Sequence, residues 1–317
     1  MESHAGRSVP NLGTGEMKKL NYNNMKQITE PTTNVKRKLK SARCAAAFFI
    51  FHFSLFIFTS CNVNDPIYER DQGKMILTTN WNQRTEGIEQ PADYTVVVNN
   101  QTLRFTQATN LLPELEEGTY PIHIYNVPEK ISIDGTTATV ATTANGEVDP
   151  VPGWLFTATT EAVYADFKEE TITALMQQQV GQLTIELTVT EGDPNHIASI
   201  TAMLTGIANS MNFKTSIYAG VNMNVAPVFN REDNKLIAII RLLGLTTEAQ
   251  KLTLTLRFTD GKEQTVESNL TDKLTAFNSE KHTPILLSAD LHLPVQTGFE
   301  ATISVWEAKT GGNGIAW

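Results

Sequence analysis

The stretch Gln182–Thr190, which reads QLTIELTVT, alternates polar and apolar residues without a break. The segment Lys251–Thr259 does the same (KLTLTLRFT) and is followed by the turn-forming pair Asp260–Gly261. Successive side chains of a β-strand point to opposite faces of the sheet, so this pattern puts one face in a core and the other in water. Both stretches therefore predict β-strands that cover a hydrophobic core.

After residue 73 the chain continues in short β-type segments separated by turn signals. The pairs Asn99–Asn100 and Asp134–Gly135 each lie between two such segments and predict hairpins. Helix is expected only at Lys168–Gln179 and Thr271–Glu280. The other predicted strands are Met75–Trp81, Tyr94–Asn99, Thr102–Thr106, Thr119–Asn126, Lys130–Asp134, Thr137–Thr142, Trp154–Thr159, Ala162–Phe167, Ile197–Thr205, Lys214–Val228, Lys235–Leu245, Lys262–Glu267, Ile285–Leu293 and Phe299–Glu307.

Strands that recur every 8–12 residues or so, without helices between them, are typical of antiparallel sandwiches. A parallel α/β sheet would need helical crossovers, which this sequence lacks. We place a domain boundary near Phe167–Gln179, because a polar connector there precedes the regular strand that begins at Gln182. The sequence predicts an all-β fold of two tandem antiparallel β-sandwich domains, an N-terminal one over residues 74–168 and a C-terminal one over 169–317.

Residues 36–61 have the layout of a secretory signal, and Met1–Val35 before them is a leader without apolar periodicity. A cationic segment, Lys36–Arg43, precedes the apolar run Cys44–Phe58, and small residues lead to Cys61. The apolar run has 15 residues, whereas a membrane-spanning helix needs about 20. This pattern predicts a leader and a bacterial lipoprotein signal peptide over residues 1–60, a lipidated Cys61 and a short tether over 61–73. The alternative is an uncleaved membrane anchor, and in both cases everything after Cys61 is exported and tethered.

Charge and cysteine content limit what the exported part can bind. Residues 61–317 hold 31 Asp and Glu against 16 Lys and Arg. Such a negative surface repels phosphate backbones, which excludes nucleic acid as an expected partner. It also gives no attraction to anionic lipids, so the acyl chains must supply the membrane attachment. Cys44 and Cys61 are the two cysteines of the chain, and their roles in the signal leave none for an internal disulfide.

The usual catalytic motifs are missing from the sequence. It contains no nucleophile elbow, zinc-protease motif, phosphate loop or dinucleotide fingerprint. The histidines beyond residue 61 are far apart and none is paired at metal-ligand spacing; they are His123, His196, His282 and His292. We therefore expect no catalytic residue, no cofactor and no metal site, and a protein that is not an enzyme.

Several short motifs point to a family. They are Ser60-Cys61, Asp65-Pro66-Ile67-Tyr68, Gly73, the strand that ends at Trp81, Leu112-Pro113, Gly118-Thr119-Tyr120 and Tyr125-Asn126. In these the chain resembles lipoproteins of the fimbrillin superfamily from Bacteroidetes, most of all its branch of minor fimbrial subunits and anchors. The resemblance implies transthyretin-like β-sandwiches and a palmitate-type lipid anchor in the outer membrane. It also implies surface exposure in a fimbrium, or pilus, and fimbrial subunits as partners in cell adhesion.

Arg84 follows the first predicted strand and is a candidate processing site. In such pili, removal of a first strand opens a groove that a strand of a neighbouring subunit fills. We hypothesise that Met75–Trp81 stays in place here, which would keep the lipid attached and end the fibre as an anchor does. A cut after Arg84 would instead release lipid and strand together and make the protein a shaft or tip subunit. An ordinary loop residue is the other interpretation of Arg84.

A surface glycan-binding lipoprotein is the alternative function. Trp81, Trp154 and Trp306 lie in predicted strands and could stack against sugars, although packing in the core is the commoner role of such residues. This alternative predicts exposed, coplanar aromatic side chains on one face of a sandwich.

Overall fold

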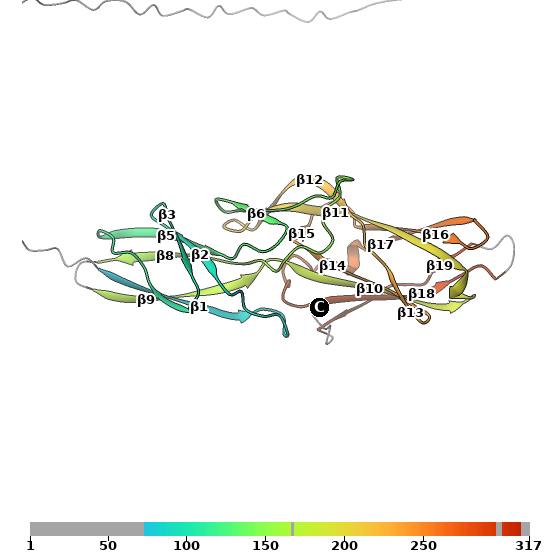
Figure 1. The fold of residues 1–317 in the computed structure, drawn as a ribbon, viewed down its shortest axis with the longest axis horizontal. Coiled ribbons are helices and arrows are strands. Elements are labelled where there is room, and N and C mark those ends of the chain that lie inside the picture. Colours follow the sequence, from blue (N-terminus) through green and yellow to red (C-terminus); the bar gives the residue numbers. More distant parts are fainter. Residues whose placement is uncertain (1–72, 166–167, 296–299, 312–317) are drawn as a thin grey trace, which may run out of the picture. The chain divides into compact units, whose positions relative to one another are not determined.

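The computed structural model describes residues 73–165, 168–295 and 300–311, without the side chains of 220–222. The predicted signal and Cys61 lie outside the described residues. The described residues all belong to one compact unit, Pro66–Trp317. They form strands in three sheets, together with the short 3-10 turns η1 (Pro194–His196) and η2 (Thr271–Lys273) (Figure 1). The all-β prediction is thereby confirmed.

The first sheet has seven strands in the order β3-β2-β5-β8-β9-β1-β4. Side chains of β2, β5 and β8 pack against those of β1 and β9 in one core, so the sheet closes over itself; we call this part the first lobe. Its strands are β1 (Lys74–Gln83), β2 (Tyr94–Val98), β3 (Gln101–Phe105), β4 (Thr109–Leu111), β5 (Gly118–Tyr125), β8 (Phe156–Tyr164) and β9 (Glu169–Gln178).

The other two sheets enclose a second core, and we call this part the second lobe. One sheet has the order β13-β14-β10-β18-β19, with β20 also pairing with β18. The other has the order β17-β16-β11-β7-β6, with β12 and β15 also pairing with β11. Their strands are β6 (Ile131–Asp134), β7 (Thr137–Val140), β10 (Gly181–Glu191), β11 (Ile197–Asn212), β12 (Ile217–Val225), β13 (Asn230–Glu232), β14 (Lys235–Leu242), β15 (Gly244–Leu245), β16 (Lys251–Phe258), β17 (Glu263–Asn269), β18 (Ile285–His292), β19 (Thr302–Ile303) and β20 (Glu307–Thr310).

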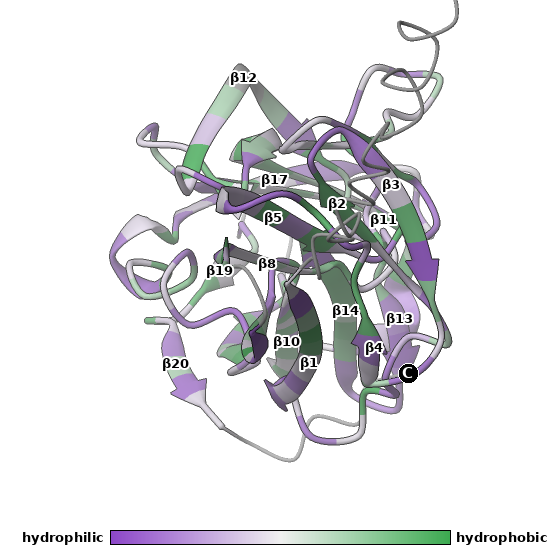
Figure 2. Ribbon diagram, turned by 90° about the vertical axis from the view of Figure 1, so that its left-hand side faces the viewer, coloured by the Kyte–Doolittle hydropathy of each residue, from purple (hydrophilic) through white to green (hydrophobic). Residues whose placement is uncertain are grey.

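The regular stretches of sequence occupy the centre of this second core. Every apolar residue of β10 from Leu183 to Val189 is buried, and every polar one between them faces outward. Leu252, Leu254 and Leu256 of β16 belong to the same core, so the two alternating stretches face each other across it. The mostly hydrophobic β14, green in Figure 2, lies between β10 and the short edge strand β13.

The predicted hairpins are present. Asn99 and Asn100 both have positive φ angles, as a two-residue hairpin turn requires, and β2 pairs with β3 around them. The hairpin of β6 and β7 turns at Gly135, which also has a positive φ angle. It does not join the first sheet, however, because β7 pairs with β11 in the second lobe.

Both helix predictions are wrong. Lys168–Gln179 contains β9, because Ile172, Ala174 and Met176 alternate and pack in the first core. Within Thr271–Glu280 only η2 is helical. The segments Trp154–Thr159 and Ala162–Phe167, expected as two strands, are represented by the single strand β8.

The pairing is also not purely antiparallel. The ladders between β1 and β9 and between β10 and β18 are parallel. The predicted domain bounds, 74–168 and 169–317, stay a prediction; β9, which begins at Glu169, pairs with β1 and β8 of the first sheet.

Candidate functional site

The first strand, β1, is an interior strand of the first lobe. It pairs in parallel with β9 along eight residue pairs and antiparallel with β4 at Ile76, Leu77 and Thr78. Its residues alternate between buried and partly exposed, because one face covers the core. Removing β1 would therefore leave unpaired edges on two strands and open the core between them.

Trp81 ties β1 into that core. Its ring meets the rings of Tyr94 and Phe156 edge-on, with centroids 5.8 and 5.7 Å away. Edge-to-face contacts of this kind stabilise beyond the area they bury. The indole Nε1 donates a hydrogen bond to Thr79 Oγ1 at 2.9 Å, and Thr79 Oγ1 donates to the carbonyl of Ala108 at 3.2 Å. Ring packing and the hydrogen bond from Nε1 together therefore hold the indole in place.

The backbone just after β1 is held by buried hydrogen bonds. Thr85 is 6% exposed, and its N–H donates to Gln178 Oε1 at 2.8 Å. Its hydroxyl lies 3.1 Å from the same Oε1 and 2.9 Å from the carbonyl oxygen of His282. Thr85 is therefore bonded both to the end of β9 and to the loop before β18, which belongs to the second lobe.

Gln178 itself is held on its other side. Its Nε2 donates to the carbonyl of Val180 at 2.8 Å and to that of Lys281 at 3.0 Å. We call Thr85, Gln178, Lys281 and His282 the strand-end junction. Every polar atom of the Gln178 amide is used in it, so the amide cannot turn without breaking a bond.

Lys281 is the buried cation of the strand-end junction. Its side chain is covered, with Nζ donating to the carbonyls of Gln179, at 3.0 Å, and of Leu243. The ammonium also lies 4.7 Å from the centre of the Tyr218 ring. Burial lowers the pKa of Lys281 to about 7 and raises the pKa of Tyr218 to about 12.

Arg84, the predicted processing residue, lies directly before Thr85 at the end of this first strand. Its side chain is half-buried, and its Nη1 is enclosed without a hydrogen-bond partner among the described residues. Proteases bind the residues around a scissile bond in extended form, which requires free backbone on both sides. Because the N–H of Thr85 is hydrogen-bonded to Gln178, the backbone after Arg84 is not free to bind a protease in this structure. Cys61, the other predicted site residue, lies outside the described residues.

The histidines do not form a site. His292 Nδ1 lies 3.2 Å from a carboxylate oxygen of Glu191, and His196 Nε2 lies 3.9 Å from one of Asp193. In the described ranges no group of three or more His, Cys, Asp or Glu converges as metal ligands would. None of the helices within those ranges has the length and apolar character needed to cross a bilayer.

The three tryptophans of the glycan-binding alternative are structural. Trp81 and Trp306 are 7% and 6% exposed. Trp154 packs against both cores, and the guanidinium of Arg241 lies 5.0 Å from its ring centre. These three rings, from different places in the described fold, do not form an exposed platform.

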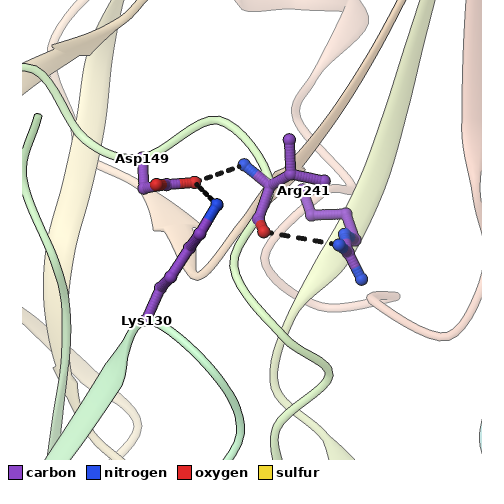
Figure 3. A network of polar contacts seen from close by, with 4 residues as sticks. Lys130, Asp149 and Arg241 are labelled. Carbon is purple, nitrogen blue, oxygen red and sulfur yellow. Dashed lines mark hydrogen bonds and ion pairs between the residues drawn. The ribbon is translucent and has the colours of Figure 1, made fainter.

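Arg241 is held in a polar network around Asp149 (Figure 3). Lys130 Nζ lies 3.1 Å from Asp149 Oδ1, which also accepts the backbone N–H of Val151 at 2.9 Å. The guanidinium of Arg241 donates to the Val151 carbonyl at 3.3 Å. The network fixes the loop beneath Trp154, and nothing in it resembles a catalytic arrangement.

Sequence reasoning missed the strand-end junction. Gln178 and Lys281 are polar residues without a recognisable motif, and only the fold brings them to Thr85. The one signal was the place of Gln178 in the alternating series Ile172, Ala174, Met176, which puts its amide on the buried face.

Residues 56–310 match the model of a family described as fimbrillin-A associated anchor proteins Mfa1 and Mfa2. A comparison with curated proteins found no match. Among solved structures, the fimbrial anchor protein Mfa2 from Porphyromonas gingivalis is similar, with 12% identity, a TM-score of 0.50, and coverage of 76% of this chain and 98% of that one.

Two further solved structures share the fold. A candidate polysaccharide-binding protein from Bacteroides thetaiotaomicron has 11% identity and a TM-score of 0.55, covering 76% of this chain and 99% of that one. A candidate adhesin from Bacteroides ovatus has 11% identity and a TM-score of 0.53, with coverage of 76% and 96%.

Proposed function

We propose a role in fimbrial anchoring, because this chain belongs to the family of fimbrillin-A associated anchor proteins Mfa1 and Mfa2. In this proposal the protein is a non-enzymatic lipoprotein of the outer membrane. Its lipidated Cys61 holds it to the bilayer, and its β-sandwiches contact the subunits of a fimbrium at the cell surface. Its partners are fimbrial subunits and lipid, and it needs no cofactor.

The observation that supports an anchor is the integration of β1. The predicted lipid site and the start of β1 at Lys74 are separated by only the twelve residues 62–73. The backbone pairing and core contacts of β1 therefore also connect the first lobe to the lipid proposed on Cys61. An anchor needs this connection to stay intact, whereas a subunit that passes into the fibre must lose it.

The geometry of β1 suits a connection under tension. Backbone hydrogen bonds in a sheet run across the strands, perpendicular to them in an antiparallel pair such as β1 and β4 and slanted in a parallel pair such as β1 and β9. A pull on the tether acts along β1, so it loads the pairs with β9 and β4 together rather than one after another. Met75, Leu77 and Trp81 add buried apolar contacts that must break in the same event.

The strand-end junction supports an uncut chain. A protease that acts after Arg84 would have to draw out Thr85, whose N–H and hydroxyl are bonded to Gln178. Such cleavage requires local opening, so its rate is limited by the stability of the junction. This protection favours the anchor hypothesis over a shaft or tip subunit that loses β1.

A pull-down from membranes tests the proposed function. The full chain carrying an affinity tag is expressed in fimbriated cells, solubilised in detergent and captured, beside a Cys61→Ala control. We expect fimbrial subunits to be captured with the unmodified chain. The control should leave the membrane fraction, because it cannot be acylated. If the unmodified chain is recovered from membranes without any fimbrial subunit, the anchoring role is contradicted.

A further inference from the structure

The sheet of the first lobe opens between β8 and β9. These strands are joined by only two ladder pairs, Phe156 with Gln178 and Thr157 with Gln177. Beyond them lies a cavity of about 400 Å³, lined on two sides by residues 158–160 of β8 and 173–175 of β9. The turn between β11 and β12 forms its third side. We call this cavity the seam groove.

The lining of the seam groove is rich in hydroxyl groups. Besides Ala158, Ala174, Leu175 and Phe213, its side chains are those of Thr157, Thr159, Thr160, Thr173, Ser216, Gln177 and Lys214. A hydroxyl group can both donate and accept a hydrogen bond, and an amide offers one group of each kind. Thr157 Oγ1 already accepts from Gln179 Nε2, at 2.9 Å. The described residues provide no hydrogen-bond partner for the side chains of Thr159, Thr173 and Gln177.

The charge of the seam groove is opposite to that of the chain. Its lining includes the ammonium of Lys214 and no carboxylate, although residues 61–317 hold 31 acidic against 16 basic residues. Lys214 is exposed and has no ion-pair partner in the described part of the chain. An anionic group entering the groove would meet this cation without competition from an internal acid.

His123 is a second ionisable residue close to the seam groove. It is the ladder partner of Thr159, and burial, then the charge of Lys214, lower the pKa of its imidazole. Its Nδ1 is enclosed and has no hydrogen-bond partner among the described residues. A neutral imidazole keeps the positive charge of this corner on Lys214 alone.

We propose that the seam groove binds an acidic sugar unit, such as a uronic acid residue of a polysaccharide. The carboxylate pairs with Lys214, and the ring hydroxyls exchange hydrogen bonds with Thr159, Thr173 and Gln177. A bare inorganic anion would satisfy Lys214 but would leave the hydroxyl groups and most of the volume unused. A neutral sugar would leave the charge unmatched.

Calorimetric titration of the full chain, purified in detergent, tests this site with three probes: glucuronate, glucose and inorganic phosphate. We expect glucuronate to bind and glucose to bind at least about tenfold more weakly, since a hydrogen bond to a charged group contributes about 1.5–3 kcal/mol. Lys214→Gln should weaken glucuronate by the same factor. Lys273→Gln, which alters another exposed lysine, should leave the affinity unchanged.

Thr159→Val provides a second variant that keeps the charge and the shape. It should weaken glucuronate without affecting phosphate, because only the sugar uses the hydroxyl. Thermal melts of all variants establish that they are folded. The proposal is overturned if glucuronate does not bind, if Lys214→Gln binds it as the unmodified chain does, or if phosphate binds more tightly than glucuronate.

Discussion

Replacing Gln178 by leucine should expose the bond between Arg84 and Thr85 to proteolysis. The leucine keeps approximately the volume of the side chain but removes its amide. One lost hydrogen bond is the one that the Thr85 N–H donates to Oε1, at 2.8 Å; the Thr85 hydroxyl, 3.1 Å from Oε1, keeps the carbonyl of His282 at 2.9 Å as its acceptor. The other two are the bonds that Nε2 donates to the carbonyls of Val180 and Lys281.

The magnitude follows from these contacts. Leucine leaves the buried N–H of Thr85 without its acceptor, which costs about 1–3 kcal/mol, so the free energy of local opening falls by about 2 kcal/mol. That difference raises the open population about 30-fold. Where opening and closing are faster than cleavage, the rate of cutting follows the open population. Trypsin should therefore cut Gln178→Leu after Arg84 about 30-fold faster than the unmodified chain.

The assay is limited digestion of the full chain in detergent, with mass spectrometry of the fragment that begins at Thr85. Gln179→Leu is the matched control, because Gln179 bonds to Thr157 and not to Thr85. Cutting after Arg257 in β16 reports global unfolding and should change much less than cutting after Arg84. Equal rates for Gln178→Leu and the unmodified chain, or equal acceleration by Gln179→Leu, would refute the protective role of the strand-end junction.

Three further predictions concern stability and are read by chemical denaturation. Because burial lowers the pKa of Lys281 from 10.5 to about 7, the unfolded chain binds a proton that the folded chain lacks between these values. Stability should therefore rise with pH from about 7 to 10.5, by at most about 1.4 kcal/mol per unit, and Lys281→Met should abolish that slope. Trp81→Ala should cost about 3–5 kcal/mol, since it removes a buried indole from the first core; a loss below about 1 kcal/mol would contradict the packing. Gly244→Ala should cost about 1–3 kcal/mol, because the added Cβ would overlap Cε1 of Tyr218; an unchanged midpoint would show that the ring is free to move.

Local periodicity predicted most of the long strands, though not β9 or the short β4 and β13, because burial of one face leaves a direct trace in the sequence. Leu183, Ile185 and Leu187 show it in β10, where every inward position is apolar. In β9 the same trace is weaker, since Ile172, Ala174 and Met176 alternate with Thr173, Leu175 and Gln177, and the exposed Leu175 breaks the polar series. The polar-rich segment Lys168–Gln179 therefore fitted a helix as well as a strand, and the helix predicted there was wrong.

Pairing over long distances could not be predicted in this way. Nothing local in the hairpin of β6 and β7 reveals that it joins β11 about 70 residues later along the chain. The strand-end junction has the same character, because Thr85 and His282 are 197 residues apart in the sequence and lie in different lobes. The periodicity of β9 puts Gln178 on the buried face but does not reveal its partners, and Lys281 lies in a loop without any periodic signal.

The proposed anchoring role requires β1 to stay covalently joined to the chain after Arg84, so that the predicted lipid on Cys61 holds the first lobe. Mass spectrometry of the amino terminus, on protein taken from outer membranes of fimbriated cells, tests it most directly. We expect an acylated Cys61 at the first position and peptides that run unbroken through Arg84 and Thr85. A membrane-associated population that begins at Thr85 would contradict it.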